Sequence, residues 1–499
     1  MELQQILSVA AAYGATVCIA DESQAKKELA GIAYDSRKVG PGYLFVAIPG
    51  MVTDGHKYID SAVAAGAIAV VAEQPPTNLP PEVALILTEN SRYLLGRLAA
   101  TYYGHPEQEL RLIGVTGTNG KTTTTHLIKF LLEYNGIKTG LIGTVHNQAG
   151  QKILPATHTT PESLELFELL AVMRAEGCRA VVMEVSSHAL SQGRTDCCDF
   201  LGAVFTNLTQ DHLDYHGSME AYCASKTRLF SMLKHSERKP AYGIVNIDDA
   251  AAPAFMEAST APVLTFGSNA VADLSLSDYR IGLFGSSFSL LYQGEIYGVH
   301  MPLVGKFNIY NALAALTCAV AEGLDIAECV RAFKHAPQVL GRFELVQAGQ
   351  DFAVAVDYAH TPDGLQNVLS TARELKPKRL ICVFGCGGNR DSGKRPLMGR
   401  IGAELSDTAI ITTDNPRFED PLEIITQVER GAKETKRDYL VEPDRAKAIE
   451  RAINMAQPGS VVVIAGKGHE DYQIVQGVKH HFDDREQARK TIEERLTIG

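Results

Sequence analysis

Residues 114–123 have the types and the spacing of a loop that binds phosphate. They read Gly-Val-Thr-Gly-Thr-Asn-Gly-Lys-Thr-Thr, follow an apolar run and precede a predicted helix over 122–134. Glycines let backbone N–H groups close around phosphate oxygens, and the N-terminus of the following helix favours negative charge. In such a loop Lys121 reaches the β- and γ-phosphates and the Thr122 hydroxyl binds Mg²⁺. The general pattern has glycine where this chain has Val115, so the alternative is a glycine turn that leads into an ordinary helix.

Two more polar groups follow predicted strands of the same region. Glu184 lies in the apolar run 180–185, and residues 211–216, rich in Asp and His, follow the run 201–206. Carboxyl ends of parallel strands meet at one edge of a sheet, so we expect both groups near the phosphate loop. Because Mg²⁺ prefers oxygen ligands, Glu184 is a candidate ligand, and His212 is a further one.

Both groups also have simpler interpretations. Ser187 and His188 could form a nucleophile–base pair, but neighbours in sequence are poorly placed for that chemistry, so hydrogen bonding within a loop is the favoured interpretation. Helix capping by Ser218 explains part of the second group.

Three loops in the last third of the chain combine glycine with charge. Residues 379–384, 408–412 and 460–464 are typical of buried parallel strands, and the loops 385–395, 414–417 and 466–470 follow them. Each loop alone could be an ordinary solvated turn. Together the guanidinium and ammonium groups, carboxylates and amides of these loops suit a ligand with both charges, such as a zwitterionic amino acid.

For three other positions, the residues alone suggest an ordinary structural role. Lys226 lies on a predicted helix, where a lysine is normally exposed. Asn308 opens an apolar helix, which suggests an N-cap. Asp357 follows the predicted strand 352–356 and precedes a helix that begins near Pro362, so it could belong to a turn or contact a nucleotide across a domain interface.

The elements that must position these residues divide the chain into three blocks. Residues 1–107 form a predicted small α/β domain, and residues 337–499 a predicted Rossmann-like domain. Residues 108–336 alternate strands with helices, which predicts a doubly wound, largely parallel sheet, with an antiparallel insertion over 274–304. Strands are predicted at 138–142, 180–185, 201–206, 243–246 and 263–266, and helices at 161–176, 219–233 and 308–322. We therefore predict an α/β protein whose three domains close around substrates.

Composition excludes several classes of function. The formal charge of 47 − 58 = −11 argues against nucleic acid or anionic lipid as a partner. No apolar run approaches the ~20 residues of a membrane span, and the N-terminus lacks the features of a signal peptide. Nine cysteines without C-x₂-C pairs indicate reduced thiols and no zinc site. We expect a cytoplasmic monomer with small-molecule partners.

These motifs resemble those of the Mur ligases, the ATP-dependent enzymes that form amide bonds in peptidoglycan synthesis. The resemblance is carried by residues 116–122, 211–217, 306–311 and 357–360, in the same order over nearly the whole chain. Within the family, Asp-Asn-Pro-Arg at 414–417 and Gly-Lys-Gly-His-Glu at 466–470 are similar to the motifs of members that add meso-2,6-diaminopimelate to UDP-N-acetylmuramoyl-L-alanyl-D-glutamate.

The resemblance implies site residues in each block. It implies that ATP is bound by Gly117, Thr118, Asn119, Gly120, Lys121, Thr122, Thr123, Asn308, Arg342 and Asp357. It implies that the UDP-muramoyl dipeptide is bound by Tyr34, Ser36, Met51, Val52, Thr53, Thr159, Thr160, Ser186, Gln192 and Arg194, together with His158, where family members often have Asn. It implies that diaminopimelate is bound by Arg390, Asp414, Asn415, Pro416, Arg417, Gly466 and Glu470.

The resemblance also changes the interpretation of Lys226, which matches a lysine that the family carbamoylates with CO₂. A carbamate offers anionic oxygens to Mg²⁺, whereas an ammonium repels the ion. The implied metal site contains Thr122, Glu184, His212 and the Lys226 carbamate, and Lys121 stabilises charge during phosphoryl transfer. The implied reaction passes through an acyl phosphate on the D-glutamyl γ-carboxylate.

The identity of the amino acid leaves alternatives. Diaminopimelate differs from lysine by a distal carboxylate, and a pocket built for such a group can reject an analogue that lacks it by ~10⁴–10⁵. Lysine-adding relatives lack the arginine at the position of Arg417, which favours diaminopimelate. Rival ligases add lysine, recycle murein tripeptide or extend folate with glutamate. A nucleotide-switched binding protein is a rival from another class, but it leaves the three loops of the last block unexplained.

Overall fold

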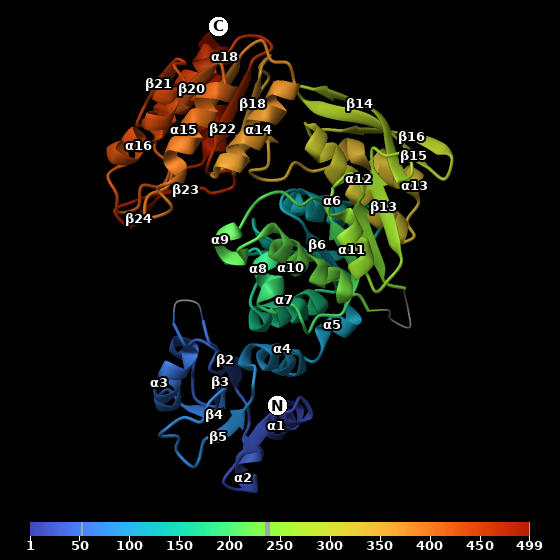
Figure 1. Ribbon diagram of the computed structural model, residues 1–499, viewed down its shortest axis with the longest axis vertical. Helices are drawn as coiled ribbons and strands as arrows, with labels where there is room; N and C mark the ends of the chain where they lie inside the picture. Colours follow the sequence, from blue (N-terminus) through green and yellow to red (C-terminus); the bar gives the residue numbers. More distant parts are fainter. Residues whose placement is uncertain (51–52, 235–239, 499) are drawn as a thin grey trace. The chain divides into compact units, whose positions relative to one another are not determined.

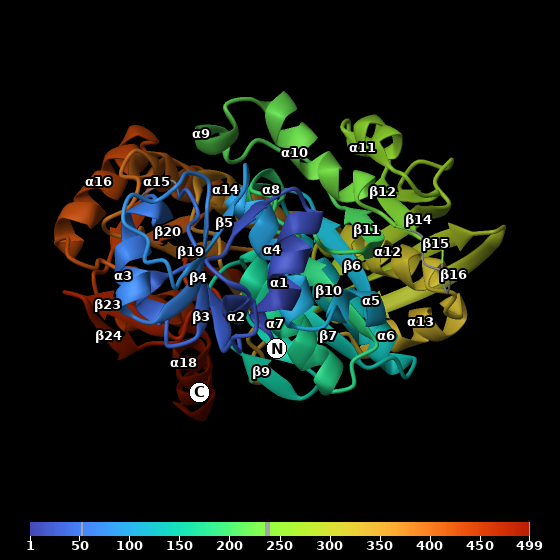
Figure 2. The ribbon, with the colours of Figure 1, turned by 90° about the horizontal axis from the view of Figure 1, so that it is seen from below.

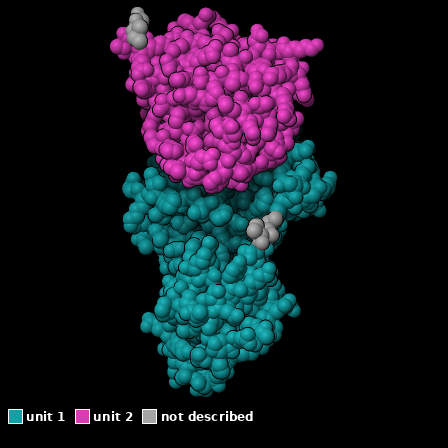
Figure 3. All heavy atoms as spheres, turned by 90° about the vertical axis from the view of Figure 1, so that its left-hand side faces the viewer, with its two compact units in different colours: residues 1–273, 314–324 teal, residues 274–313, 325–499 magenta. Residues whose placement is uncertain are grey.

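A computed structural model describes residues 1–50, 53–234 and 240–498 (Figure 1). The chain divides into two compact units (Figure 3). Unit 1 contains residues 1–273 and 314–324, and unit 2 contains residues 274–313 and 325–499. The α/β class predicted from the sequence is confirmed in both.

The first part of unit 1 is a small sheet with strand order β1-β5-β4-β3-β2. Its strands are β1 (Thr16–Cys18), β2 (Gly31–Ala33), β3 (Tyr43–Val46), β4 (Ala67–Ala72) and β5 (Ala84–Leu87). Neighbouring strands are parallel except for the pair β1–β5. The α-helices are α1 (Leu3–Ala12), α2 (Glu22–Ala25), α3 (Ile59–Ala64), α4 (Ser91–Tyr102) and α5 (Pro106–Glu109).

The second part of unit 1 is a larger sheet with strand order β13-β12-β11-β6-β10-β7-β8-β9. Its first six strands in that order are parallel. Strand β8 pairs antiparallel with β7, and β9 pairs antiparallel with β8. The strands are β6 (Arg111–Thr116), β7 (Thr139–Ile142), β8 (Asn147–Ala149), β9 (Lys152–Leu154), β10 (Ala180–Glu184), β11 (Phe200–Phe205), β12 (Tyr242–Asn246) and β13 (Val263–Gly267). All five predicted strands of this block are confirmed, with ends shifted by one residue at most.

The helices of this part of unit 1 are labelled in Figure 2. They are α6 (Lys121–Tyr134), α7 (Ser163–Ala175), α8 (Ser187–Ser191), α9 (Leu213–His216), α10 (Met219–Ser231) and α11 (Ala252–Ala258). Helix α6 packs against β6, β7 and β10, and α10 packs against β6 and β11. Every residue of β10, β11 and β12 is buried, as expected for parallel strands with both faces covered.

Unit 2 begins with the predicted antiparallel insertion, which is confirmed. Strands β14 (Leu274–Gly282), β15 (Gly285–Tyr292) and β16 (Glu295–Met301) form consecutive antiparallel pairs. Helix α12 (Lys306–Ala321) follows, with residues 306–313 in unit 2 and residues 314–321 in unit 1, and α13 (Ile326–Ala332) comes next. Because α12 already begins at Lys306, Asn308 lies inside its first turn, and the expected N-cap at this position is wrong.

The rest of unit 2 is a sheet of order β17-β18-β22-β19-β20-β21, parallel except for β17. Its strands are β17 (Glu344–Leu345), β18 (Ala353–Asp357), β19 (Leu380–Phe384), β20 (Thr408–Ile411), β21 (Tyr439–Val441) and β22 (Val461–Ala465), and β23 (Tyr472–Val475) pairs with β24 (Val478–His481) in a separate hairpin. The α-helices are α14 (Pro362–Glu374), α15 (Lys394–Leu405), α16 (Pro421–Glu434), α17 (Arg445–Met455) and α18 (Asp484–Ile498). The predicted buried strands 379–384, 408–412 and 460–464 are confirmed, so the three loops that follow them leave the same edge of one sheet.

Among the helices of the described residues, none combines the length and the hydrophobicity needed to cross a bilayer.

Candidate functional site

The phosphate loop connects β6 to α6 as the sequence predicted. Gly117 has φ 147° and Gly120 has φ 85°, backbone conformations that favour glycine. A Cβ at position 117 would lie 2.0 Å from Thr206 Oγ1, so the close approach also requires glycine. Lys121 Nζ donates to the carbonyl oxygens of Gly117 and Thr118 at 2.9 and 2.8 Å, which folds this side chain back across the loop.

Glu184 lies at the end of β10 and contacts the start of α6. Its side chain is 1% exposed. Thr122 Oγ1 donates to Glu184 Oε2 at 3.0 Å, and Thr144 donates through its backbone N at 2.8 Å and its hydroxyl at 3.1 Å. This set of hydroxyl and carboxylate oxygens beside a phosphate loop has the donor chemistry that Mg²⁺ prefers.

Lys226 is buried, which corrects the expectation of an exposed helix lysine. It lies on α10 and is 1% exposed. Its Nζ donates to the Gly117 carbonyl at 2.8 Å and lies 4.5 Å from the centre of the Tyr222 ring. Burial, reinforced by the nearby Lys121 ammonium, holds the pKa of Lys226 well below its usual value. The sequence shows a helix here but not that this face of α10 packs onto the loop.

His212 belongs to a group of stacked rings. It has φ 53° at the start of α9, and its side chain is 45% exposed. The ring centre of His188 lies 4.7 Å away, and burial with the neighbouring His212 and His216 lowers the pKa of His188 to about 4. Ser187 Oγ lies 3.0 Å from His216 Nε2. The Ser187 hydroxyl therefore pairs with a histidine of another segment, and not with its sequence neighbour His188.

The residues assigned to the muramoyl dipeptide form a connected network around Thr160. Thr160 Oγ1 donates to the Glu184 carbonyl at 2.8 Å and accepts from Ser186 N at 3.0 Å. Arg194 donates to the Thr160 carbonyl at 3.0 Å and to Gln192 Oε1 at 3.0 and 2.7 Å. These two hydrogen-bond acceptors, a carbonyl and an amide oxygen, hold the arginine in one orientation.

The remaining dipeptide candidates lie at the border of this network or in the small sheet. Thr159 Oγ1 lies 3.1 Å from Thr144 Oγ1, whereas His158 is exposed. Tyr34 donates its hydroxyl to Glu165 Oε1 at 2.9 Å. Ser36 opens a short 3₁₀ helix, Ser36–Lys38, and Thr53 Oγ1 lies 3.1 Å from Tyr58 OH. Met51 and Val52 lie outside the described residues.

Glu162 is part of this network and was not predicted from the sequence. Its carboxylate forms an ion pair with Arg92, which lies on helix α4 in the first part of unit 1. The same carboxylate lies 3.7 Å from Arg194 Nε. The Glu162 side chain is 11% exposed. A separation of 70 positions between Arg92 and Glu162 leaves no local sequence signal for this contact.

In unit 2, the residues assigned to ATP are held by the backbone. Asn308 donates to the Val304 carbonyl at 2.9 Å and accepts from Asn311 Nδ2 at 3.1 Å. Asp357 accepts from the backbone N of Phe343 at 2.7 Å and of Ala359 at 2.8 Å. Burial raises the pKa of Asp357, and Arg342 opposes that shift. The Arg342 guanidinium lies 5.3 Å from the centre of the Tyr358 ring.

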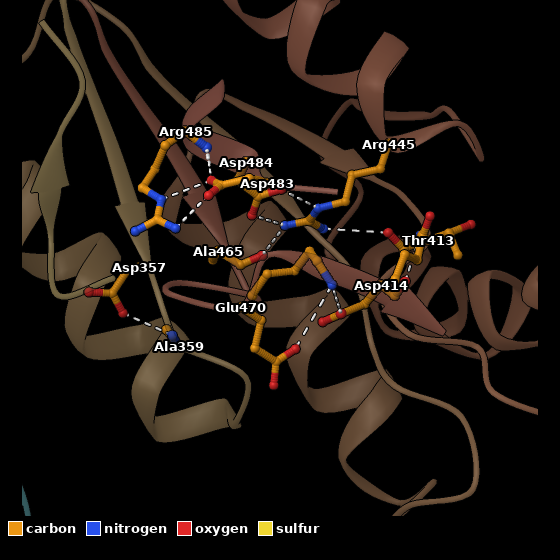
Figure 4. A network of polar contacts seen from close by, with 12 residues as sticks. Asp357, Ala359, Thr413, Asp414, Arg445, Ala465, Glu470, Asp483, Asp484 and Arg485 are labelled. Carbon is orange, nitrogen blue, oxygen red and sulfur yellow. Dashed lines mark hydrogen bonds and ion pairs between the residues drawn. The ribbon is translucent and has the colours of Figure 1, made fainter. Parts of the chain in front are cut away.

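Asp414 and Glu470 come together at the carboxyl ends of β20 and β22 (Figure 4), and Asn415 contacts Glu470. Asn415 Nδ2 donates to Glu470 Oε2 at 2.9 Å, and its Oδ1 accepts from Ile474 N at 2.9 Å. Gly466 has φ 121°, and a Cβ there would lie 2.7 Å from Asp414 Oδ2. The loop thus brings two carboxylates and an amide to one place.

The cations of this region differ in their environments. Arg417 has φ 53° and donates from Nη1 to the Gly388 carbonyl at 2.8 Å, next to the buried Pro416. Arg390 is exposed. Arg445 is fully buried, and Asp484 accepts from its Nε and Nη2, each at 2.7 Å (Figure 4).

Lys467 is a further cation of this region. It belongs to the motif at 466–470, but the sequence predicted no role for it. Its side chain is 0% exposed, 3.7 Å from Asp414 Oδ1. The only sequence signal for such a position is a lysine between two glycines, directly after a buried strand.

Comparison with known proteins relates the whole chain to one family. Residues 28–103 match the model described as "Mur ligase family, catalytic domain", residues 115–319 the "Mur ligase middle domain", and residues 341–468 the "Mur ligase, glutamate ligase domain". These matches confirm the three-domain architecture.

Curated relatives and a solved structure extend this similarity over nearly the full length. A UDP-N-acetylmuramoyl-L-alanyl-D-glutamate--2,6-diaminopimelate ligase of Syntrophomonas wolfei subsp. wolfei is 50% identical over 93% of this chain and 95% of its own. The protein of the same name from Geobacillus kaustophilus is 46% identical over 94% of this chain and 96% of its own. A solved structure of a ligase with this name is 34% identical, with a TM-score of 0.71 over 99% of each chain.

Proposed function

Because the chain belongs to the Mur ligase family, we propose that it is an ATP-dependent ligase that adds meso-2,6-diaminopimelate to the D-glutamate of UDP-N-acetylmuramoyl-L-alanyl-D-glutamate. The observation that carries this proposal is the 50% identity to a relative of that name over 93% of the chain.

The proposed reaction needs energy because a carboxylate does not condense with an amine unaided. The D-glutamyl γ-carboxylate attacks the γ-phosphorus of ATP, which releases ADP and leaves an acyl phosphate. The amine of diaminopimelate then attacks the acyl carbon, and the tetrahedral intermediate expels inorganic phosphate. The proton lost by the attacking nitrogen leaves with solvent or phosphate. Neither step attaches a residue of this chain covalently.

The phosphate loop has the parts that this phosphoryl transfer requires. Loop amides and Lys121 surround the phosphates and stabilise the charge that develops on their oxygens. Asn308, Arg342 and Asp357 contribute further contacts to the nucleotide. When bound, Mg²⁺ neutralises phosphate charge, and Thr122, Glu184 and His212 are the residues that would hold it.

Lys226 contributes a carbamate in this proposal. CO₂ reacts with a neutral amine, and burial lowers the pKa of Lys226, so that the neutral form becomes accessible. The product exchanges a buried cation near Gly117 for an anion that suits a metal-bound phosphate site.

Acceptor and amine are recognised by different units in this proposal. In unit 1, Arg194 pairs with a carboxylate of the muramoyl dipeptide, while Thr159, Thr160, Ser186, Gln192 and His158 supply polar contacts, and Tyr34, Ser36 and residues 51–53 contact the uridine nucleotide. In unit 2, Arg417 and Arg390 pair with the distal carboxylate of diaminopimelate, and Asp414, Asn415 and Glu470 accept its distal ammonium, with Pro416 and Gly466 shaping the loops. Lysine would leave Arg417 without its partner.

The proposed boundaries of the three domains are 1–107, 108–336 and 337–499. We also propose that the protein acts in the cytoplasm, because all three substrates of the proposed reaction are small and water-soluble, and that it acts as a monomer.

The test measures phosphate release and product mass with each substrate omitted in turn. The complete mixture of ATP, Mg²⁺, UDP-muramoyl dipeptide and diaminopimelate is expected to yield the UDP-muramoyl tripeptide. Each omission is expected to abolish the tripeptide. Slow ATP hydrolysis that ignores the muramoyl substrate, without tripeptide, would instead support a nucleotide-switched binding protein.

A further inference from the structure

Lys467 is a buried cation in contact with three residues assigned to diaminopimelate. Its Nζ lies 3.7 Å from Asp414 Oδ1 and 3.9 Å from Glu470 Oε2, and it donates to Asn415 Oδ1 at 3.4 Å. The side chain is 0% exposed, and lysines are rarely buried so completely without charged partners. Lys467 therefore contacts the proposed recognition residues from inside the protein.

The charge of Lys467 matters because two carboxylates share this place. Burial and the neighbouring Asp414 raise the pKa of Glu470, and Lys467 opposes that shift. Without a cation beside it, the Glu470 carboxyl would more readily take up a proton. Arg445 is also close, but its guanidinium is bound through two nitrogens by Asp484 (Figure 4). Lys467 therefore forms ion pairs with both Asp414 and Glu470, and Arg417 adds positive charge near Glu470.

Lys467 also fixes the orientation of the Asn415 amide. Asn415 Oδ1 accepts from Lys467 Nζ and from Ile474 N, and Asn415 Nδ2 donates to Glu470 Oε2. An ammonium can only donate, so the amide oxygen must face Lys467 and the amide nitrogen must face Glu470. Removing the ammonium would take away one of the contacts that select this orientation.

We propose that Lys467 is a positioning residue that sets specificity for the distal ammonium of diaminopimelate. It places positive charge within 3.9 Å of both the Asp414 and the Glu470 carboxylates and orients Asn415 between them. The distal ammonium of diaminopimelate then meets the charged acceptors Asp414 and Glu470. Arg417 provides the positive charge for the distal carboxylate. This inference rests on the proposed function, since it takes diaminopimelate as the amine.

The experiment compares two amines with the parent enzyme and with Lys467→Met, which keeps an apolar stem and removes the charge. 2-Aminopimelate retains the attacking amine and both carboxylates of diaminopimelate but lacks its distal ammonium. We expect Lys467→Met to lower kcat/KM for diaminopimelate by about 30-fold and for 2-aminopimelate by less than about 3-fold, as loss of a charged partner predicts. The KM for ATP is expected to stay unchanged.

The matched control is Lys433→Met, which removes an exposed lysine paired with Glu429 at 3.5 Å in the same unit; its kinetics are expected to equal those of the parent. Lys467→Gln, neutral but still able to donate to Asn415, is the second variant should Lys467→Met not fold, and it is expected to lose discrimination in the same way. Equal losses for both amines would show a merely structural role and overturn the inference, as would unchanged use of diaminopimelate. A parent enzyme that fails to use diaminopimelate would overturn the proposed function itself.

Discussion

The amine of Lys226 sits in an environment that disfavours its charged form. It is buried, shares the Gly117 carbonyl with Lys121 and has a pKa well below its usual value. Two ammonium groups on one carbonyl oxygen repel each other, so conversion of one of them to an anion relieves that repulsion. If Lys226 carries the proposed carbamate, the Lys121 ammonium becomes a favourable neighbour of the charge at this position.

Removal of CO₂ is expected to lower ligase activity, and added bicarbonate is expected to restore it. Lys226→Ala is expected to lose about 10²–10³ in kcat, the usual effect of removing one electrostatic stabiliser, and to recover partly with a short carboxylate such as formate. Steady-state assays in degassed buffer, with and without bicarbonate, measure both effects. Lys234→Ala, a change at an exposed lysine of the same unit, is the control. Full activity of Lys226→Ala without any added carboxylate would remove the carbamate from the mechanism.

Arg417 is the side chain that separates diaminopimelate from lysine in the proposed site. Arg417→Ala is expected to lower kcat/KM for diaminopimelate by about 100-fold, because a charge-assisted pair with the distal carboxylate is lost. The low activity with lysine is expected to change little. The ratio of kcat/KM for diaminopimelate to kcat/KM for lysine is therefore expected to fall. Kinetics with both amines measure this, with Arg430→Ala, at an exposed arginine on α16, as the control. Identical constants for Arg417→Ala and the parent would exclude the role.

At the scale of elements, the first turn of α7 joins the small sheet of unit 1 to the dipeptide network. Glu162, the residue before α7, pairs with Arg92 and lies near Arg194, and Glu165, in the first turn, accepts from Tyr34. One helix end therefore contacts residues assigned to the uridine nucleotide and to the dipeptide. We infer that α7 holds these two parts of the acceptor site in register.

Glu162→Gln is expected to raise the KM for the UDP-muramoyl dipeptide by about 10-fold, because a neutral amide holds two arginines less firmly than a carboxylate. The KM values for ATP and diaminopimelate are expected to stay the same. Glu168→Gln, at an exposed position of the same helix, is the control. An equal rise in all three KM values would indicate a general loss of structure and would contradict this role for Glu162.

The sequence predicted elements better than it predicted contacts between them. Parallel strands such as β10 and β11 are continuous apolar runs, and their burial on both faces makes such runs recognisable. The position of Asn308 was misjudged because its partner, the Val304 carbonyl, lies upstream of the turn at Gly305. Lys226, Glu162 and Lys467 depend on which face of a helix or loop is covered by a distant segment, and no local pattern records that information.

At the scale of the whole molecule, the proposed substrates divide between the two units. Dipeptide candidates lie in unit 1, and diaminopimelate candidates lie in unit 2. A ligand slows amide exchange where it suppresses local opening. We expect the UDP-muramoyl dipeptide to protect amides around residues 158–160 and 186–194.

We expect diaminopimelate, added after the dipeptide and a non-hydrolysable ATP analogue, to protect the loops 385–395, 414–417 and 466–470. Hydrogen exchange followed by mass spectrometry of peptides measures both steps, and lysine in place of diaminopimelate is the control, with little added protection expected. The loops leave one edge of the parallel sheet of unit 2, so a ligand held there must order all three together. Protection by diaminopimelate confined to unit 1 would contradict the division of substrates between the units.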